Sequence, residues 1–184
     1  MFATDGPACV ARWPLVRVVP GQTTVVELLS AEWIRLVTHY HRATTLCLET
    51  EKCPLCFYLP ARVYWYLPVH LQASGTMGLL ECSNTACSTL ETRLRFLDLK
   101  LEAGLILECS RQGKKSPVRL EPVGPSGRLR SAPLELWGSA LFAVYRLPPI
   151  APRERLEDYG DRVADRVAAR AEVIVASVKA GKKQ

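Results

Sequence analysis

The segment THYHRATTLCLETEKCPLC, residues 38–56, contains three cysteines and two histidines within nineteen positions. Cys53 and Cys56 form a CxxC pair, a tight turn that offers two thiolates to one metal ion. Cys47 lies six residues before this pair and supplies a third sulfur. Together with one histidine, these cysteines would complete a tetrahedral zinc site, because zinc accepts both sulfur and nitrogen donors.

Two histidines could supply the fourth ligand. We favour His39, eight residues before Cys47, because it would sit at the end of a strand, which presents a ring nitrogen rigidly. His41, six residues before Cys47, is the alternative, and the sequence does not decide between them. A thioredoxin-type redox pair would need a βαβ context, whereas the flanks here have the patterns of a strand, a loop and a strand. Four protein ligands leave no open coordination position, so we expect a structural rather than a catalytic ion.

Composition limits the class of protein. The chain has 184 residues, of which 48% are hydrophobic, as in one globular domain with its own core. The N-terminal segment lacks the pattern of a secretory signal, and no apolar run is long enough to span a membrane, so we expect a cytoplasmic protein without a membrane partner, in a bacterial cytosol or a phage-infected cell. The formal net charge of +6 favours a polyanionic partner.

The seven cysteines are expected to be metal ligands or buried thiols rather than disulfides, because the chain lacks a secretory signal. Cys9, Cys82, Cys87 and Cys109 show no ligand-like grouping. We therefore expect them to behave as small buried apolar residues.

Strand patterns dominate the first half of the chain. Branched residues on either side of a PGQ turn predict strands within residues 12–40, and alternation predicts another strand over residues 61–71. The pattern of residues 105–123 predicts a hairpin with a basic tip. The chain therefore predicts a mainly β domain.

Two helices are predicted. Ser88 and Glu91 form a capping box, which predicts a helix that ends near Gly104. Residues 153–179 carry an apolar stripe at helical spacing and predict one long helix. The type of the apolar segment at 134–147 is left open. The domain organisation is thus a β-rich domain over residues 1–150 with a zinc insertion at about 38–60, followed by a C-terminal helix and basic tail over residues 151–184.

A family resemblance rests on the order of several motifs, VPGQ, VVELL, THYHRATTLC, CPLC and RVYWYLPV. Over residues 15–70 this order resembles the zinc-containing single-stranded DNA-binding proteins of phages, the type of the T-even helix-destabilising protein, and small bacterial and phage relatives. The resemblance implies an OB-like β-barrel with an inserted zinc subdomain, a role in DNA replication or repair, and ligands in the order His39, Cys47, Cys53 and Cys56. The gaps between the ligands are shorter here than in the T-even protein.

A single-strand binder needs cations for phosphates and flat rings for bases. We expect Arg62, Tyr64 and Tyr66 to line a groove while Trp65 packs inward. The remaining expected contacts are basic or aromatic residues around the zinc segment and at the hairpin tip. They are Tyr40, Arg42, Lys52 and Tyr58 in the first group and Arg111, Lys114, Lys115 and Arg119 in the second.

The functional prediction is a non-enzymatic protein that binds single-stranded DNA with little sequence preference and uses a structural Zn²⁺ ion. No P-loop, GxSxG or HExxH motif is present. The alternatives are a zinc-ribbon-like protein-interaction or oligomerisation module, and an RNA-binding module, which the same stacking chemistry would serve. The near-heptad stripe of the C-terminal helix permits a homo-oligomer.

Overall fold

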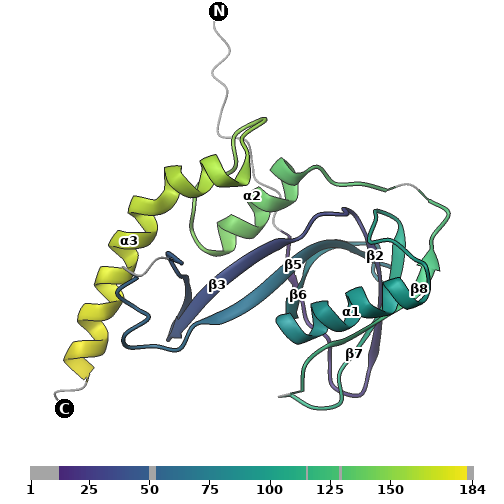
Figure 1. The fold of residues 1–184 in the computed structure, drawn as a ribbon, viewed down its shortest axis with the longest axis horizontal. Coiled ribbons are helices and arrows are strands. Elements are labelled where there is room, and N and C mark those ends of the chain that lie inside the picture. Colours follow the sequence, from purple (N-terminus) through teal and green to yellow (C-terminus); the bar gives the residue numbers. More distant parts are fainter. Residues whose placement is uncertain (1–12, 50–52, 115, 129, 182–184) are drawn as a thin grey trace, which may run out of the picture.

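Figure 1 shows the computed structural model of the chain, which describes residues 13–49, 53–114, 116–128 and 130–181. The strands are β1 (Leu15–Val16), β2 (Thr23–Leu28), β3 (Ile34–His41), β4 (Ala43–Leu46), β5 (Arg62–Leu71), β6 (Met77–Ser83), β7 (Leu105–Ser110) and β8 (Arg119–Pro125). The helices are α1 (Asn84–Phe96), α2 (Leu134–Val144) and α3 (Leu156–Gly181). The prediction of a mainly β fold with a long C-terminal helix is confirmed.

The ten-residue strand β5 organises the sheet. The order along the sheet is β1-β6-β5-β2-β7-β8, and β3 pairs with both β5 and β4. One edge of β5 is shared by two strands, because Ile34–Thr38 of β3 pair with its first half and Val26–Leu28 of β2 with its second half. All pairs are antiparallel except that of β1 with β6.

The sheet is not closed into a barrel, so the predicted OB-like barrel is not confirmed. β1 contributes only two residues and pairs in parallel with β6. At the other end, β8 pairs only with β7 within the residues that the structure describes. The chain then leaves β8 and crosses to α2, so the two end strands do not join.

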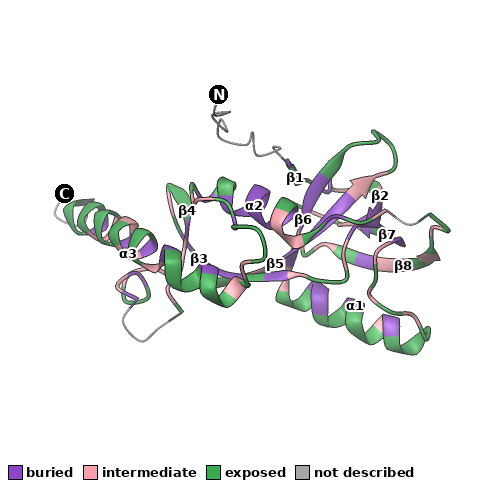
Figure 2. Cartoon of the chain, turned by 90° about the horizontal axis from the view of Figure 1, so that it is seen from above, coloured by how far each residue is buried: buried purple, intermediate pink, exposed green. Residues whose placement is uncertain are grey.

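Helices cover the two faces of the sheet and enclose two hydrophobic cores (Figures 1 and 2). Successive strand residues point to opposite faces, so neighbours in β5 enter different cores. Tyr66 packs with Trp137 and the first half of α3, whereas Leu67 packs with Leu90 of α1. Cys82, Cys87 and Cys109 are buried in the α1 core, as predicted; Cys9 lies outside the described residues.

Helix α1 begins earlier than the capping box predicts. Its N-cap is Ser83, whose hydroxyl accepts a hydrogen bond from the Ala86 N–H at 3.3 Å. Ser88 lies inside the helix, where its hydroxyl donates to the Thr85 carbonyl. The prediction of a start at Ser88 is wrong because strand β6 runs directly into the helix without the loop that a separate capping box would require.

Helix α3 confirms the long helix, and residues 134–147, left unassigned from sequence, contain helix α2. The predicted stripe of α3 is buried at Tyr159, Val163, Val167, Ala171 and Val178. The remaining surface is largely exposed, as Figure 2 shows. None of the helices in the described ranges combines the length and the apolar character that a membrane span requires.

We expect Ser83→Ala to lower the free energy of unfolding by about 1 kcal/mol, because the Ala86 N–H loses its acceptor. The matched control is Ser88→Ala, which removes an exposed hydroxyl from the helix interior and should change stability by less than about 0.5 kcal/mol. Urea unfolding followed by circular dichroism measures both. A larger loss for Ser88→Ala than for Ser83→Ala would contradict the observed cap.

Candidate metal centre

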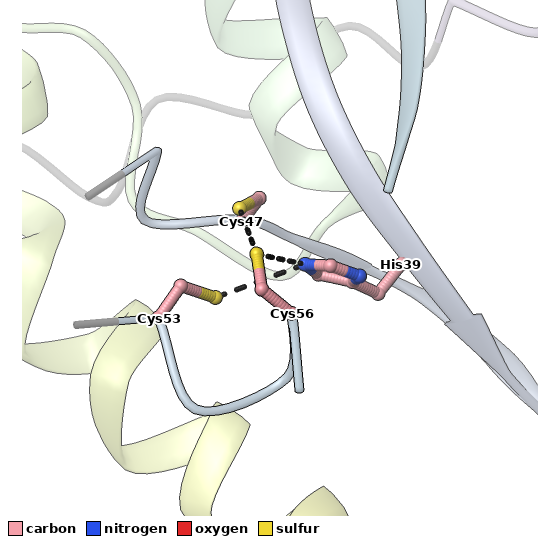
Figure 3. A group of neighbouring side chains, drawn as sticks. All are labelled: His39, Cys47, Cys53 and Cys56. Atoms are coloured by element: carbon pink, nitrogen blue, oxygen red, sulfur yellow. Dashed lines mark hydrogen bonds between the residues drawn. The ribbon is translucent and has the colours of Figure 1, made fainter. Parts of the chain in front are cut away.

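Four predicted ligand residues converge beside the β3–β4 hairpin, and Figure 3 shows their side chains pointing toward one another. The ligand atoms of His39, Cys47, Cys53 and Cys56 all lie within 4.8 Å of one another. The Cys47 and Cys56 sulfurs are 3.6 Å apart, and His39 Nε2 lies 3.7 Å from Cys53 Sγ and 3.6 Å from Cys56 Sγ. These four residues could hold one metal ion.

The spacing of the donor atoms has the size of a tetrahedral site. Bonds of about 2.3 Å to sulfur and 2.0–2.1 Å to nitrogen give edges of about 3.8 Å between sulfurs and about 3.6 Å between sulfur and nitrogen. Three of the six separations lie within about 0.2 Å of these edges, and all six are within 4.8 Å. The donor set therefore fits an ion with the coordination preferences of zinc.

Two local structures bring the donors together. In the β3–β4 hairpin, His39 pairs with Thr45, and the Cys47 N–H bonds to the Val37 carbonyl at 2.8 Å, so Cys47 stays alongside β3. The CxxC pair forms a tight turn in which the Cys56 N–H donates to the Cys53 carbonyl at 3.2 Å. The metal centre thus ties a hairpin to a turn that follows it in the chain.

His39 rather than His41 belongs to the group, which decides the alternative that the sequence left open. Both residues lie on the same face of β3, because they are two positions apart on one strand. His41 sits about 7 Å further along, at the turn of the hairpin, and therefore does not reach the sulfurs. The ring of His39 is buried, with 1% of the residue exposed.

The protein environment acts differently on the three thiols. Burial raises the pKa of the Cys47 thiol to about 12 and also raises the pKa of the Cys56 thiol. Burial opposes ionisation of Cys53 as well, but hydrogen bonds from the backbone N–H groups of Leu48, Leu55 and Cys56 and from the Cys47 thiol together outweigh it and lower the pKa of Cys53 to about 6. A metal ion binds thiolates, so binding must displace protons from Cys47 and Cys56, and affinity must fall as the pH falls.

The CxxC turn also forms the docking surface for the second half of α3. Leu55 is fully buried, and it packs with Cys53 of the turn and Ala171 of the helix. Ile174 and Val175 extend this small core, in which the loop after β4 lies against α3. The Lys179 ammonium lies over the Tyr58 ring, 5.6 Å from its centroid. The metal centre is therefore coupled by packing to the C-terminal helix.

The residues predicted to contact DNA do not form a single surface. Around the hairpin and the CxxC turn, Tyr40 is 60% exposed, Arg42 is exposed at the turn and Tyr58 is partly covered. Lys52 lies outside the described residues.

At the β7–β8 tip, the predicted cations are constrained by their neighbours. The Arg111 guanidinium donates to the carbonyls of Gly113, Lys114 and Ser116. Arg119 and Lys114 are both exposed, and Arg119 forms an ion pair with Glu121 at 2.5 Å. Lys115 lies outside the described residues.

On β5, the three residues expected to line a groove differ in their exposure to solvent. Arg62 is exposed and Tyr64 is partly buried, but Tyr66 is only 1% exposed. The Tyr66 hydroxyl donates to Glu81 at 2.7 Å and shares a hydrogen bond with the Tyr145 hydroxyl. The placement of Tyr66 in a groove is wrong, because the residues that follow α2 cover this end of the face.

Trp65 takes the opposite face to Tyr66, as expected from alternation. Its ring packs against Trp33 and its indole N–H donates to Asn84 at 3.0 Å. It is only partly buried.

Sequence reasoning missed four arginines that line cavities. Arg17 joins Tyr64 and Arg111 around a groove of about 880 Å³ between the β1 segment and the β7–β8 tip. Arg146, Arg166 and Arg170 line a smaller pocket beside the hairpin. The i, i+4 spacing of the last two on a helix was a usable signal, whereas nothing local marks Arg17.

Comparison with protein-family models, with curated proteins and with solved structures found no match.

We expect the purified protein to retain about one zinc ion per chain, since the four donors form one tetrahedral site. His39→Asn should lose most of this metal, because only three donors remain. His41→Asn, the matched control, should retain it. Metal content after gel filtration measures the difference, and equal retention in the two variants would contradict the assignment of His39.

Proposed function

We propose that the protein is a zinc-stabilised, non-enzymatic protein that binds single-stranded DNA with little sequence preference. The observation that carries this proposal is the groove of about 880 Å³, which brings an aromatic ring and two guanidinium groups to one surface. Bases stack on aromatic rings and phosphates bind cations, so a single strand needs both kinds of group.

Three residues supply these groups. Tyr64 comes from β5, Arg17 from the segment after β1 and Arg111 from the end of β7. Arg111 is held by bonds to three backbone carbonyls, so its charge is presented at a fixed position. Glu81 also lines the groove, but its carboxylate accepts the Tyr66 hydroxyl hydrogen bond.

Zinc is the ion that we propose for the metal centre. Three thiolates and one imidazole favour a borderline-soft ion, and four protein donors fill a tetrahedral shell. When bound, the ion would fix the CxxC turn against the β3–β4 hairpin. Tyr40 and Arg42 on that hairpin would then be held in place beside the sheet.

We expect zinc-loaded protein to bind labelled oligo-dT with an affinity that falls steeply as salt rises, since phosphate contacts release counterions. Tyr64→Leu should weaken binding by about 1–3 kcal/mol, the contribution of one stacked base. Phe96→Leu, which removes an exposed aromatic ring outside the groove, is the matched control and should leave affinity unchanged. Fluorescence anisotropy measures all three proteins.

Parallel titrations with oligo-rU and duplex DNA decide between the candidate functions. Tighter binding of oligo-rU than of oligo-dT would favour RNA as the partner. No binding of any of the three would contradict the nucleic-acid proposal and favour a protein-interaction module.

A further inference from the structure

A second cavity, of about 290 Å³, lies next to the metal centre and contains an unusual concentration of positive charge. Its walls come from β4, from the segment that follows α2 and from α3. Three arginines line it, Arg146, Arg166 and Arg170, and no acidic residue among those that the structure describes does so. The volume is at the small end of ligand sites, which suits a chemical group rather than a large molecule.

The three guanidinium groups differ in how they are held. Arg170 Nη1 donates to the Tyr145 carbonyl at 2.8 Å, so this side chain is fixed at the wall of the pocket. Arg146 and Arg166 form no ion pair with any acidic residue in the described ranges. By contrast, Arg162, one turn before Arg166, is paired with Glu154 at 2.7 Å.

Repulsion between these arginines is not relieved within the described residues. Arg166 and Arg170 are four residues apart on α3, where like charges destabilise a helix. The C-terminus of α2 also faces this region, and its dipole carries about half a negative charge. One arginine bonded to the Tyr145 carbonyl can offset that half charge, so the other two leave a net positive pocket.

The backbone at Arg146 gives an independent observation. Arg146 has φ of 60°, the left-handed region, at the position immediately after the C-cap residue Tyr145 of α2. The Arg146 N–H bonds to the Ala143 carbonyl and the Leu147 N–H to the Phe142 carbonyl, which is a Schellman motif. Glycine is the residue that this left-handed position favours. An arginine here therefore carries a conformational cost, and its side chain is what glycine would not supply.

Thr45 lines the pocket on the side of β4 and is 2% exposed. Its Oγ1 is buried and has no hydrogen-bond partner within the part of the chain that the structure describes, so a water-sized molecule in the pocket does not reach this oxygen. The anion-binding groups of the pocket are therefore its guanidinium groups, whose planar N–H pairs match the oxygens of a tetrahedral oxyanion.

We propose that this pocket binds a phosphate group through Arg146, Arg166 and Arg170. Resting on the proposed function, we assign this group to the backbone of the bound single strand. The pocket would then fix the strand beside the metal centre, at a distance from the groove that holds Tyr64.

The test uses the zinc-loaded chain of 184 residues and its variant Arg146→Gly. Glycine suits φ of 60°, so this variant should fold at least as well as the native chain. The matched control is Arg153→Gly, which removes the same charge at another left-handed position, φ 64°, outside the pocket.

Inorganic phosphate, titrated against chloride at constant ionic strength, should shift the amide resonances of residues 145–147 saturably in the native protein and in Arg153→Gly. Arg146→Gly should lose this response. The salt slope of oligo-dT binding should fall by about 1 for Arg146→Gly and remain unchanged for Arg153→Gly.

Absence of a saturable phosphate response in the native protein, or an equal response in Arg146→Gly, would overturn the pocket. A phosphate response that is lost in Arg146→Gly without a change in the oligo-dT slope would support a site for free phosphate and overturn its assignment to the strand. If oligo-dT does not bind the native protein at all, the proposed function is contradicted. The phosphate titration then still tests whether the pocket binds phosphate.

Discussion

The cluster of one imidazole and three sulfurs is the constraint on which the β3–β4 hairpin, the CxxC turn and the second half of α3 depend, on the left of Figure 1. His39 belongs to the sheet, whereas Cys53 and Cys56 belong to a turn that has little core of its own. Full burial of a side chain such as Leu55 contributes about 1.5–3 kcal/mol, and a structural zinc ion contributes about 10–16 kcal/mol in small domains. We therefore expect a bound ion, rather than hydrophobic packing, to hold this turn in place.

Helix α3 depends on this turn along its second half. Its first half packs on the main core through Tyr159 and Val163, but from Ala171 onward it lies against the turn. Arg166 and Arg170 lie where these two halves meet, so the position of the proposed phosphate pocket is set by both contacts. If the proposed function holds, a bound ion would act on the phosphate pocket only through the packing of α3 on the turn.

Features that depend on neighbours in sequence could be predicted, and features that depend on distant segments could not. The ligand set lies within residues 39–56, and donor chemistry and spacing predicted its three cysteines and one histidine but left the choice between His39 and His41 open. The burial of Tyr66 depends on Tyr145, 79 residues further along, which no strand pattern reveals. The start of α1 was misplaced because Ser88 and Glu91 match a capping box, whereas Ser83 is followed three residues later by Ala86, and only the end of β6 selects Ser83. The open sheet likewise reflects the short β1 and the path after β8, which alternation within single strands does not encode.

The most direct measurement is hydrogen exchange on the metal-loaded protein and on the same protein after chelation. We expect chelation to increase exchange in the β3–β4 hairpin, in residues 53–59 and in α3 from Ala171 to Val178, because these elements share the ligands or the core beside them. Helix α1, which packs in a separate core, should keep its protection. Unchanged exchange in α3 and the hairpin after complete removal of the metal would contradict the central role of the four ligands.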